Sequence, residues 1–195
     1  MSYSEDLKLF AEKHTYELLN VGGSKFRYVL SDKKGGRTLV LLNGGMNTLE
    51  MWMKYMEPLS ADYQVLLFDY PQELRTNQEL VKGMKEFFDK LGVTKPVFIG
   101  ASDGGMVAQI YTQKYHGGVG GLILISTGGM DAATIKSFKK KYFLAPLMLF
   151  YMKHCKYEKL KPKLIKAGMG HIRNESKVNY FRKQKILLTY VKRGL

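Results

Sequence analysis

The 195-residue chain is predicted to adopt an α/β fold, with a mostly parallel sheet covered by helices on both faces. Short runs that are apolar at nearly every position recur between residues 38 and 126, as is typical of strands buried on both sides. Segments with apolar residues three and four positions apart separate these runs and indicate helices. Strands that alternate with helices in this way predict a parallel sheet with crossover helices.

The first part of the chain supplies a helix and a hairpin. Residues 5–14 have the pattern of a short amphipathic helix. Residues 16–21 and 25–30 are strand-like, and Gly22-Gly23 lies between them, which predicts a hairpin at the sheet edge. A buried strand over 38–42 follows and leads into a helical stretch that includes Met51 and Trp52.

The middle of the chain continues the alternation. Residues 64–69 form the next buried strand, and the periodic apolar residues of 77–91 predict a helix. A strand over 96–99, a helix over 106–115 and a strand over 121–126 come next. There are no internal repeats or low-complexity linkers, so residues 1–130 are predicted to form one core.

Residues 131–195 differ in both pattern and charge. They are predicted to be all-helical, with helices over 132–141, 146–159 and 175–193. They contain 17 Lys and Arg against three acidic residues, whereas residues 1–130 contain 14 of each sign, so the net charge of +14 comes from the last third. Such asymmetry can indicate binding to nucleic acid or an anionic membrane. The basic residues are spread along amphipathic patterns, however, so we favour a solvated helical face and expect no nucleic-acid partner.

Several other classes of protein are disfavoured. The longest apolar stretch, residues 142–152, is too short to span a membrane, and the N-terminus does not have the pattern of a signal peptide. A single cysteine, Cys155, excludes an internal disulfide and fits a reducing compartment, so we expect the protein in the cytoplasm. No Cys/His cluster has zinc spacing, and the glycine-rich segment 117–121 precedes a strand rather than a helix. We therefore expect neither a metal nor a cofactor.

The strongest chemical signal is a serine at a strand-to-helix turn. Gly100-Ala101-Ser102-Asp103-Gly104 follows an apolar strand and opens a helical run. Small residues on both sides of Ser102 permit the cramped backbone that exposes its hydroxyl. We interpret Ser102 as a nucleophile. The alternative is that Ser102 only caps the following helix.

A second motif, Asn43-Gly44-Gly45-Met46, directly follows the strand over 38–42. Together with the serine turn, it resembles the α/β-hydrolase superfamily, in its branch with a serine nucleophile. In that family the corresponding loop supplies one oxyanion-hole amide, and a histidine is common where Asn43 stands. The resemblance assigns the oxyanion hole to the amides of Gly45 and Asp103, with Met46 as the alternative in the loop.

The resemblance also implies an architecture. It predicts a three-layer fold whose active site is covered by a helical cap, and residues 131–195 occupy the position of this cap. In this family the acid and histidine of the triad follow the serine along the chain. The strands that would carry them are missing from this sequence, so the chain is interpreted as lacking the C-terminal part of the fold.

No histidine of the chain is assigned as the catalytic base. His116 lies at the far end of the helix that follows Ser102, and His14 precedes the sheet. His154 and His171 fall in the cap region, where a solvated or packed histidine is the more common case. Ser102 is thus predicted to be a nucleophile whose usual partners are absent.

Other residues near these motifs have two interpretations each. Gly44, Met46 and Trp52 are candidates for a substrate pocket, and the methionine-rich segment around Trp52 could line an acyl site, although such residues are more often core. The Asp103 carboxylate could bind a cationic substrate group, but we favour a first-turn acid that complements the helix dipole. For Asp69 we expect a structural role in the adjacent loops.

The sequence therefore predicts a serine hydrolase that acts on a carboxylic ester or related acyl bond of a small molecule. A serine rather than an aspartate at the turn argues against the epoxide-hydrolase and dehalogenase branches of the superfamily. For the 195-residue chain alone we expect little or no turnover, and a missing segment or a homo-oligomer would complete it. The alternatives are a non-catalytic binding or scaffold protein of the same fold and a binder of anionic surfaces.

Overall fold

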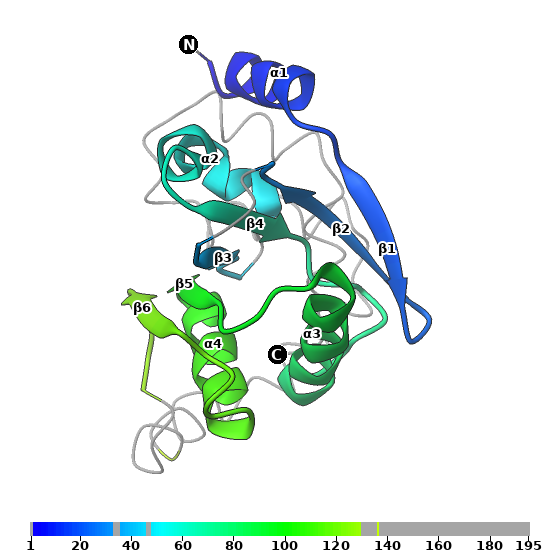
Figure 1. Cartoon of the computed structure of the whole chain (residues 1–195), viewed down its shortest axis with the longest axis vertical. Coiled ribbons are helices and arrows are strands. Elements are labelled where there is room, and N and C mark those ends of the chain that lie inside the picture. The colour runs from blue at the N-terminus through cyan, green and yellow to red at the C-terminus, as the bar shows by residue number, and fades with distance from the viewer. Residues whose placement is uncertain (1, 33–35, 46–47, 130–135, 137–195) are drawn as a thin grey trace, which may run out of the picture.

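The computed structural model describes residues 2–32, 36–45, 48–129 and 136. Within them, one six-stranded sheet packs against helices on both faces (Figure 1). This arrangement confirms the predicted α/β class. The predicted helices of residues 131–195 lie outside the described residues, of which only Lys136 belongs to that segment.

The sheet is mostly parallel. Its strands are β1 (Glu17–Val21), β2 (Ser24–Leu30), β3 (Thr38–Leu42), β4 (Gln64–Phe68), β5 (Val97–Ala101) and β6 (Gly121–Ile125). Their order across the sheet is β1-β2-β4-β3-β5-β6. The β1–β2 hairpin lies at one edge, as predicted, and β2 pairs with β4 antiparallel. The pairs β3–β4, β3–β5 and β5–β6 are parallel.

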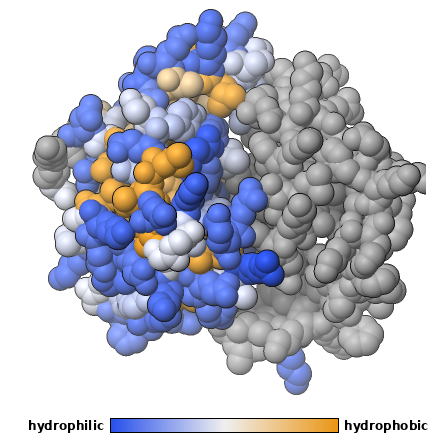
Figure 2. All heavy atoms as spheres, turned by 90° about the vertical axis from the view of Figure 1, so that its right-hand side faces the viewer, coloured by the Kyte–Doolittle hydropathy of each residue, from blue (hydrophilic) through white to orange (hydrophobic). Residues whose placement is uncertain are grey.

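The helices cover the two faces of the sheet in separate groups. They are α1 (Tyr3–Lys13), the 3-10 helix η1 (Leu49–Trp52), α2 (Met53–Ser60), α3 (Asn77–Leu91) and α4 (Asp103–Lys114). One face packs against α3 and α4, and the opposite face packs against α1, η1 and α2. The described residues on the face shown in Figure 2 are mostly hydrophilic, with smaller apolar areas among them.

Alternation along the strands builds the two cores. In β3, Val40 and Leu42 contribute to the core under α3 and α4, whereas Leu39 and Leu41 contribute to the opposite core. β4 alternates in the same way between the two clusters. Because successive side chains point to opposite faces, a strand between two helical layers must be apolar throughout. This requirement explains why the buried runs could be recognised in the sequence.

Capping residues set the helix boundaries. The helix α3 has its predicted bounds, because Thr76 forms a capping box with Glu79 and Gly92 ends the helix with φ 67°. The helix α1 begins earlier than predicted, because Ser2 forms a capping box with Glu5. The helix α4 begins directly after Ser102, three residues earlier than its apolar periodicity suggested.

The strand β6 forms the other edge of the described sheet. Its four apolar residues are between 38% and 49% exposed: Leu122, Ile123, Leu124 and Ile125. The sequence predicts a strand buried on both faces here, and the described residues cover neither face completely. The carboxyl ends of β3, β5 and β6, by contrast, converge on one well-packed turn, which contains Ser102.

Candidate active site

Ser102 lies at an exposed turn between β5 and α4. Its backbone has φ 66° and ψ −111°, a conformation that residues other than glycine rarely adopt. Ser102 occupies the N-cap position, yet its side chain makes no capping hydrogen bond to α4. The structure thus does not support the interpretation of Ser102 as a helix cap. A strained backbone of this kind is most often found at functional sites.

Glycines make the turn possible because the backbone segments pass very close to one another. A Cβ atom at Gly100 would lie 2.6 Å from the carbonyl oxygen of Gly104. A Cβ atom at Gly104 would overlap the carbonyl oxygens of Leu42 and Asn43. The first turn of α4 therefore packs directly against the end of β3, where the second predicted motif begins.

The structure brings this second motif against the serine. A Cβ atom on Gly44 would lie 3.2 Å from the Ala101 carbonyl oxygen and 3.6 Å from the Ser102 Cβ. A methyl group on Gly44 would thus be in van der Waals contact with Ser102, so the loop lies beside the nucleophile candidate. Gly45, the next residue, is half-buried, and Met46 lies outside the described residues. The assignment of oxyanion amides to Gly45 and Asp103 stays a prediction.

Three hydrogen bonds hold the beginning of this loop. Asn43 is buried, and its Nδ2 donates to the Phe68 carbonyl oxygen at 2.9 Å. The Tyr70 hydroxyl donates to the Asn43 carbonyl oxygen at 3.1 Å. The Gly44 amide donates to the Met51 sulfur at 3.4 Å. The segment after β4 and the residues of η1 thus fix the position of the loop beside Ser102.

A charged cluster holds the other end of the loop. Asp69 Oδ1 accepts from the Leu49 amide at 2.7 Å, and Asp69 Oδ2 accepts from Arg27 Nε at 2.6 Å. Arg27 Nη2 also donates to Glu50 Oε1 at 2.8 Å. Burial raises the pKa of Asp69, and the attraction of Arg27 offsets part of this effect. These bonds give Asp69 the structural role in the adjacent loops that was expected from the sequence.

The ionisation of Arg27 and of its neighbour Tyr16 follows from the same cluster. Burial lowers the pKa of Arg27, but the attraction of Asp69 and Glu50 outweighs it, so the net pKa is raised. Burial and the negative charge of Glu50 raise the pKa of Tyr16. Arg27 therefore stays charged and Tyr16 stays protonated, which preserves the cluster over the neutral pH range.

The methionine-rich segment is mostly core. Trp52 is 6% exposed, and Met53 and Met56 lie in the same cluster beneath α1 and α2. This is the alternative that the sequence favoured for these residues, and a pocket role for Trp52 stays a prediction. Met51 is the exception, because its sulfur accepts the hydrogen bond from Gly44.

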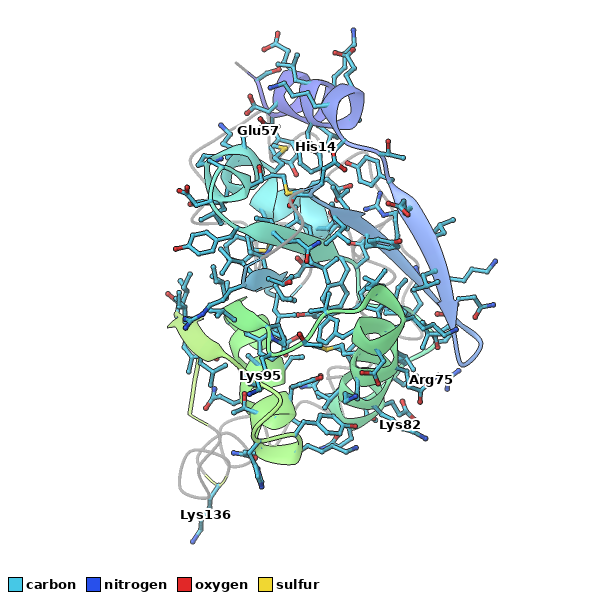
Figure 3. The ribbon with its side chains drawn as sticks, viewed as in Figure 1. His14, Glu57, Arg75, Lys82, Lys95 and Lys136 are labelled. Atoms are coloured by element: carbon cyan, nitrogen blue, oxygen red, sulfur yellow. The ribbon has the colours of Figure 1, made fainter. Side chains whose placement is uncertain are left out.

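No histidine of the described residues serves Ser102 in the structure. His116 follows the C-terminal end of α4, the end opposite to Ser102. His14 Nε2 lies 2.9 Å from Glu57 Oε1 of α2, and Figure 3 shows this pair near the end of α1. His154 and His171 lie outside the described residues. The proton acceptor for Ser102 thus stays unassigned.

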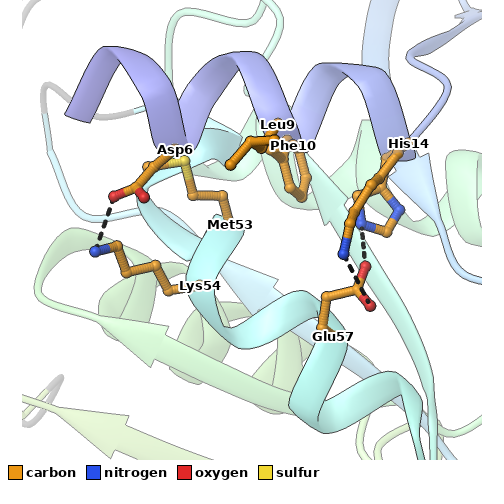
Figure 4. Close-up of a pocket in the computed structure, with 8 residues that line it drawn as sticks. Asp6, Leu9, Phe10, His14, Met53, Lys54 and Glu57 are labelled. Atoms are coloured by element: carbon orange, nitrogen blue, oxygen red, sulfur yellow. Dashed lines mark ion pairs between the residues drawn. The ribbon is translucent and has the colours of Figure 1, made fainter. Parts of the chain in front are cut away.

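A shallow cavity of about 170 Å³ lies between α1 and α2, on the face of the sheet opposite to α4 (Figure 4). Leu9, Phe10 and Met53 supply its apolar lining. Lys54 pairs with Asp6 at 2.9 Å, and Glu57 pairs with His14 at the other end of the cavity. These pairs join the two helices, so we interpret the cavity as a by-product of how α1 docks on α2.

Sequence reasoning missed one neighbour of Ser102, namely Thr127. The Thr127 hydroxyl donates to the Ser102 carbonyl oxygen at 2.7 Å. Its position could have been found, because Thr127 follows the carboxyl end of the strand adjacent to β5, where ligand-side residues of a parallel sheet gather.

Among the described residues, no group of three His, Cys, Asp or Glu could hold a metal ion. None of the described helices has the length and apolar character needed to cross a membrane.

Comparison with known proteins identifies the fold family. A sequence model of the α/β-hydrolase fold family matches residues 37–153. The chain is 31% identical over 128 residues to 2-hydroxy-6-oxo-6-phenylhexa-2,4-dienoate hydrolase of Burkholderia cepacia, which covers 57% of this chain and 44% of that protein. It is 27% identical over 131 residues to monoacylglycerol lipase abhd6-A of Xenopus laevis, with coverage of 61% and 39%.

The fold is also found in solved structures. The structure of epoxide hydrolase CorEH aligns with a TM-score of 0.65 at 16% identity and covers 93% of this chain and 71% of that one. Two of these proteins are named as hydrolases and one as a lipase, and their names differ in the compound concerned. The chain spans less than half the length of the two curated relatives.

Proposed function

This chain belongs to the α/β-hydrolase fold family, and we propose that the protein, at the length found in its native source, is a serine hydrolase. The observation that carries this proposal is the exposed Ser102, held with positive φ between β5 and α4 and with Gly44 beside it. The hydrolase names of the relatives support the general class of reaction. The protein at this length is called the native-length protein.

The proposed substrate is a carboxylic ester or a related acyl compound. Ser102 Oγ attacks the carbonyl carbon, its proton passes to a base, and the carbonyl oxygen becomes an oxyanion. The amides of Gly45 and Asp103 stabilise this oxyanion, because one lies in the loop beside Ser102 and the other begins α4. The base returns the proton to the leaving oxygen, so collapse of the intermediate expels the alcohol and leaves an acyl-enzyme on Ser102. Water then releases the acid and regenerates the serine.

Two features support an acyl substrate over an epoxide. The residue at the turn is a serine, whereas the resemblance to the superfamily implies an aspartate at this position in its epoxide-hydrolase branch. One of the curated relatives is named as a monoacylglycerol lipase. We also propose a cytoplasmic location, because the single cysteine, Cys155, fits a reducing compartment.

The test is hydrolysis of a series of p-nitrophenyl esters of increasing acyl length by the native-length protein. We expect Ser102→Ala to lower kcat by at least about a thousandfold, because removal of the nucleophile removes the acyl-enzyme route. Ser60→Ala is the matched control, since Ser60 is a partly exposed serine whose hydroxyl donates to the Glu57 carbonyl oxygen within α2. Full activity of Ser102→Ala would refute the proposal. The 195-residue chain alone is expected to show little or no turnover.

The second candidate is a non-catalytic binding or scaffold protein of the same fold. It is favoured by one observation, that no histidine of the described residues serves Ser102. The two candidates differ in their reaction with an electrophile. A serine hydrolase forms a covalent adduct with a fluorophosphonate, whereas a scaffold protein without an activated serine does not.

A further inference from the structure

We propose that Thr127, which follows β6, is a positioning residue that holds the Ser102 backbone in the conformation required for attack. The inference rests on the proposed function, since it assigns a role toward the same nucleophile. Thr127 does not act on the substrate in this proposal. It acts through the peptide group of Ser102.

Both backbone polar groups of Ser102 are bonded to residues at the end of β6 or directly after it. The Ser102 amide donates to the Ile125 carbonyl oxygen at 2.9 Å. The Thr127 hydroxyl donates to the Ser102 carbonyl oxygen at 2.7 Å. The peptide groups on either side of the strained φ and ψ angles are therefore both fixed by the neighbouring strand. Strained conformations persist only where several such contacts determine them together.

The Thr127 side chain also packs against the first turn of α4. A Cβ atom on Gly105 would lie 2.6 Å from the Thr127 Cβ, so only a glycine leaves room for the threonine there. One turn further along, Gln109 Nε2 donates to the Gly128 carbonyl oxygen at 2.9 Å and to that of Gly105 at 3.2 Å. The segment after β6 is thus bonded to α4 at two successive turns, and Thr127 lies at the turn next to Ser102.

A second strained residue faces the first. Ala101 and Ile125 are partners in the β5–β6 register, so Ser102 and Ser126 leave the two strands side by side. Ser126 has φ 49°, which ends the strand immediately before Thr127. The backbone thus bends with a positive φ at both Ser102 and Ser126. Thr127, which follows Ser126, donates its hydroxyl to the Ser102 carbonyl oxygen and so links the two bends.

Removal of this hydroxyl should affect the geometry of the turn more than the stability of the fold. The Ser102 carbonyl oxygen also accepts from the amides of Gly105 and Met106 at 3.1 and 3.3 Å. These bonds remain in a Thr127→Val variant, so no backbone acceptor is left without a partner. Valine keeps the branched shape that packs against Gly105. It loses the bond to Ser102 and the longer bond, of 3.4 Å, that the same hydroxyl donates to the Gly128 carbonyl oxygen.

The test uses Thr127→Val and Thr127→Ser in the native-length protein, with two readouts. We expect the valine variant to lower the maximal rate of fluorophosphonate labelling about five- to tenfold, the effect of losing one hydrogen bond in the reactive geometry. The reagent concentration for half-maximal rate should be unchanged. Amide hydrogen exchange over residues 101–106 should become about fivefold faster. Thr127→Ser keeps the hydroxyl and should restore both values.

Thr112→Val is the matched control. The Thr112 hydroxyl donates to the Ala108 carbonyl oxygen at 2.8 Å, so it makes the same type of bond on the same helix, away from the turn. This variant should label and exchange like the wild type. A Thr127→Val variant that also matches the wild type in both readouts would overturn the inference. If the wild type does not label, the proposed function fails, and hydrogen exchange alone decides whether Thr127 holds the turn.

Discussion

Ser102 illustrates how single residues carry the strain of the candidate site. A backbone with φ 66° costs on the order of 1–3 kcal/mol in a residue that has a side chain. The neighbours of Ser102 offset this cost by close packing, because Gly100 and Gly104 allow β5, α4 and the end of β3 to approach one another. The turn therefore depends on the absence of side chains at particular positions as much as on the serine.

We expect Gly104→Ala to lower the free energy of unfolding by about 1–3 kcal/mol, since its Cβ would overlap the carbonyl oxygens of Leu42 and Asn43. Urea denaturation measures this change. Gly121→Ala is the control, because a Cβ there meets only Val97 methyl groups at 3.6 and 3.7 Å, and it should change stability by less than about 0.5 kcal/mol. Equal stability of the two variants would contradict the close packing described here.

At the scale of elements, the loop between β3 and η1 is positioned from both ends. Tyr70 and Phe68 bind its beginning through Asn43, and Asp69 binds its end through Leu49. All three anchors come from the segment at the end of β4. The position of the loop beside Ser102 is thus set by a neighbouring strand rather than by the loop itself.

We expect Asp69→Asn to lower the free energy of unfolding by about 1–3 kcal/mol, because Arg27 loses a charged partner in a partly buried cluster. Asp89→Asn removes an exposed pair with Lys85 instead and should cost only about 0.3–0.5 kcal/mol. Thermal or urea denaturation compares the two variants. A smaller effect for Asp69→Asn than for Asp89→Asn would show that the cluster does not hold the fold together.

The β1–β2 hairpin gives a prediction for alkaline pH. Burial, together with the hydrogen bond to Glu17, raises the pKa of Tyr28 from 10.0 to about 12. The folded protein therefore keeps this proton while the unfolded chain loses it, so the stabilising effect is complete below about pH 10 and is lost as the pH rises toward 12.

The free energy of unfolding should therefore fall as the pH rises from 10 to 12. Tyr28→Phe should reduce the slope of this free energy against pH by the equivalent of about one proton. An ultraviolet titration of tyrosinate formation would show directly that Tyr28 loses its proton at a higher pH in the folded protein than in the unfolded chain. A slope that the substitution leaves unchanged would mean that Tyr28 titrates normally in the folded state.

The elements were predictable where the sequence carries its own signal. Thr76 and Gly92 mark the ends of α3, and the apolar runs mark the buried strands. The contacts of the candidate site were not predictable in this way. The bond from Thr127 to Ser102 joins residues 25 positions apart, and the anchors of Asn43 come from a strand that is adjacent only in the folded sheet. Such contacts depend on strand order, which apolar periodicity does not determine.

On the scale of the whole molecule, the sheet formed by the described residues has two different edges. The hairpin forms one edge, and the apolar strand β6 forms the other, with its side chains 38–49% exposed. Strands of this composition are typical of the interior of a parallel sheet. The chain also spans less than half the length of its two curated relatives described above. Activity is therefore best tested on the native-length protein.

The central claim is that Ser102 is the nucleophile of a hydrolase. The most direct measurement is labelling of the native-length protein with a fluorophosphonate, followed by mass spectrometry of its peptides. We predict one adduct, on Ser102, that is absent from the Ser102→Ala variant and weak or absent in the 195-residue chain alone. No adduct on Ser102 of the folded native-length protein, or an adduct only on another residue, would contradict the account and favour the scaffold protein.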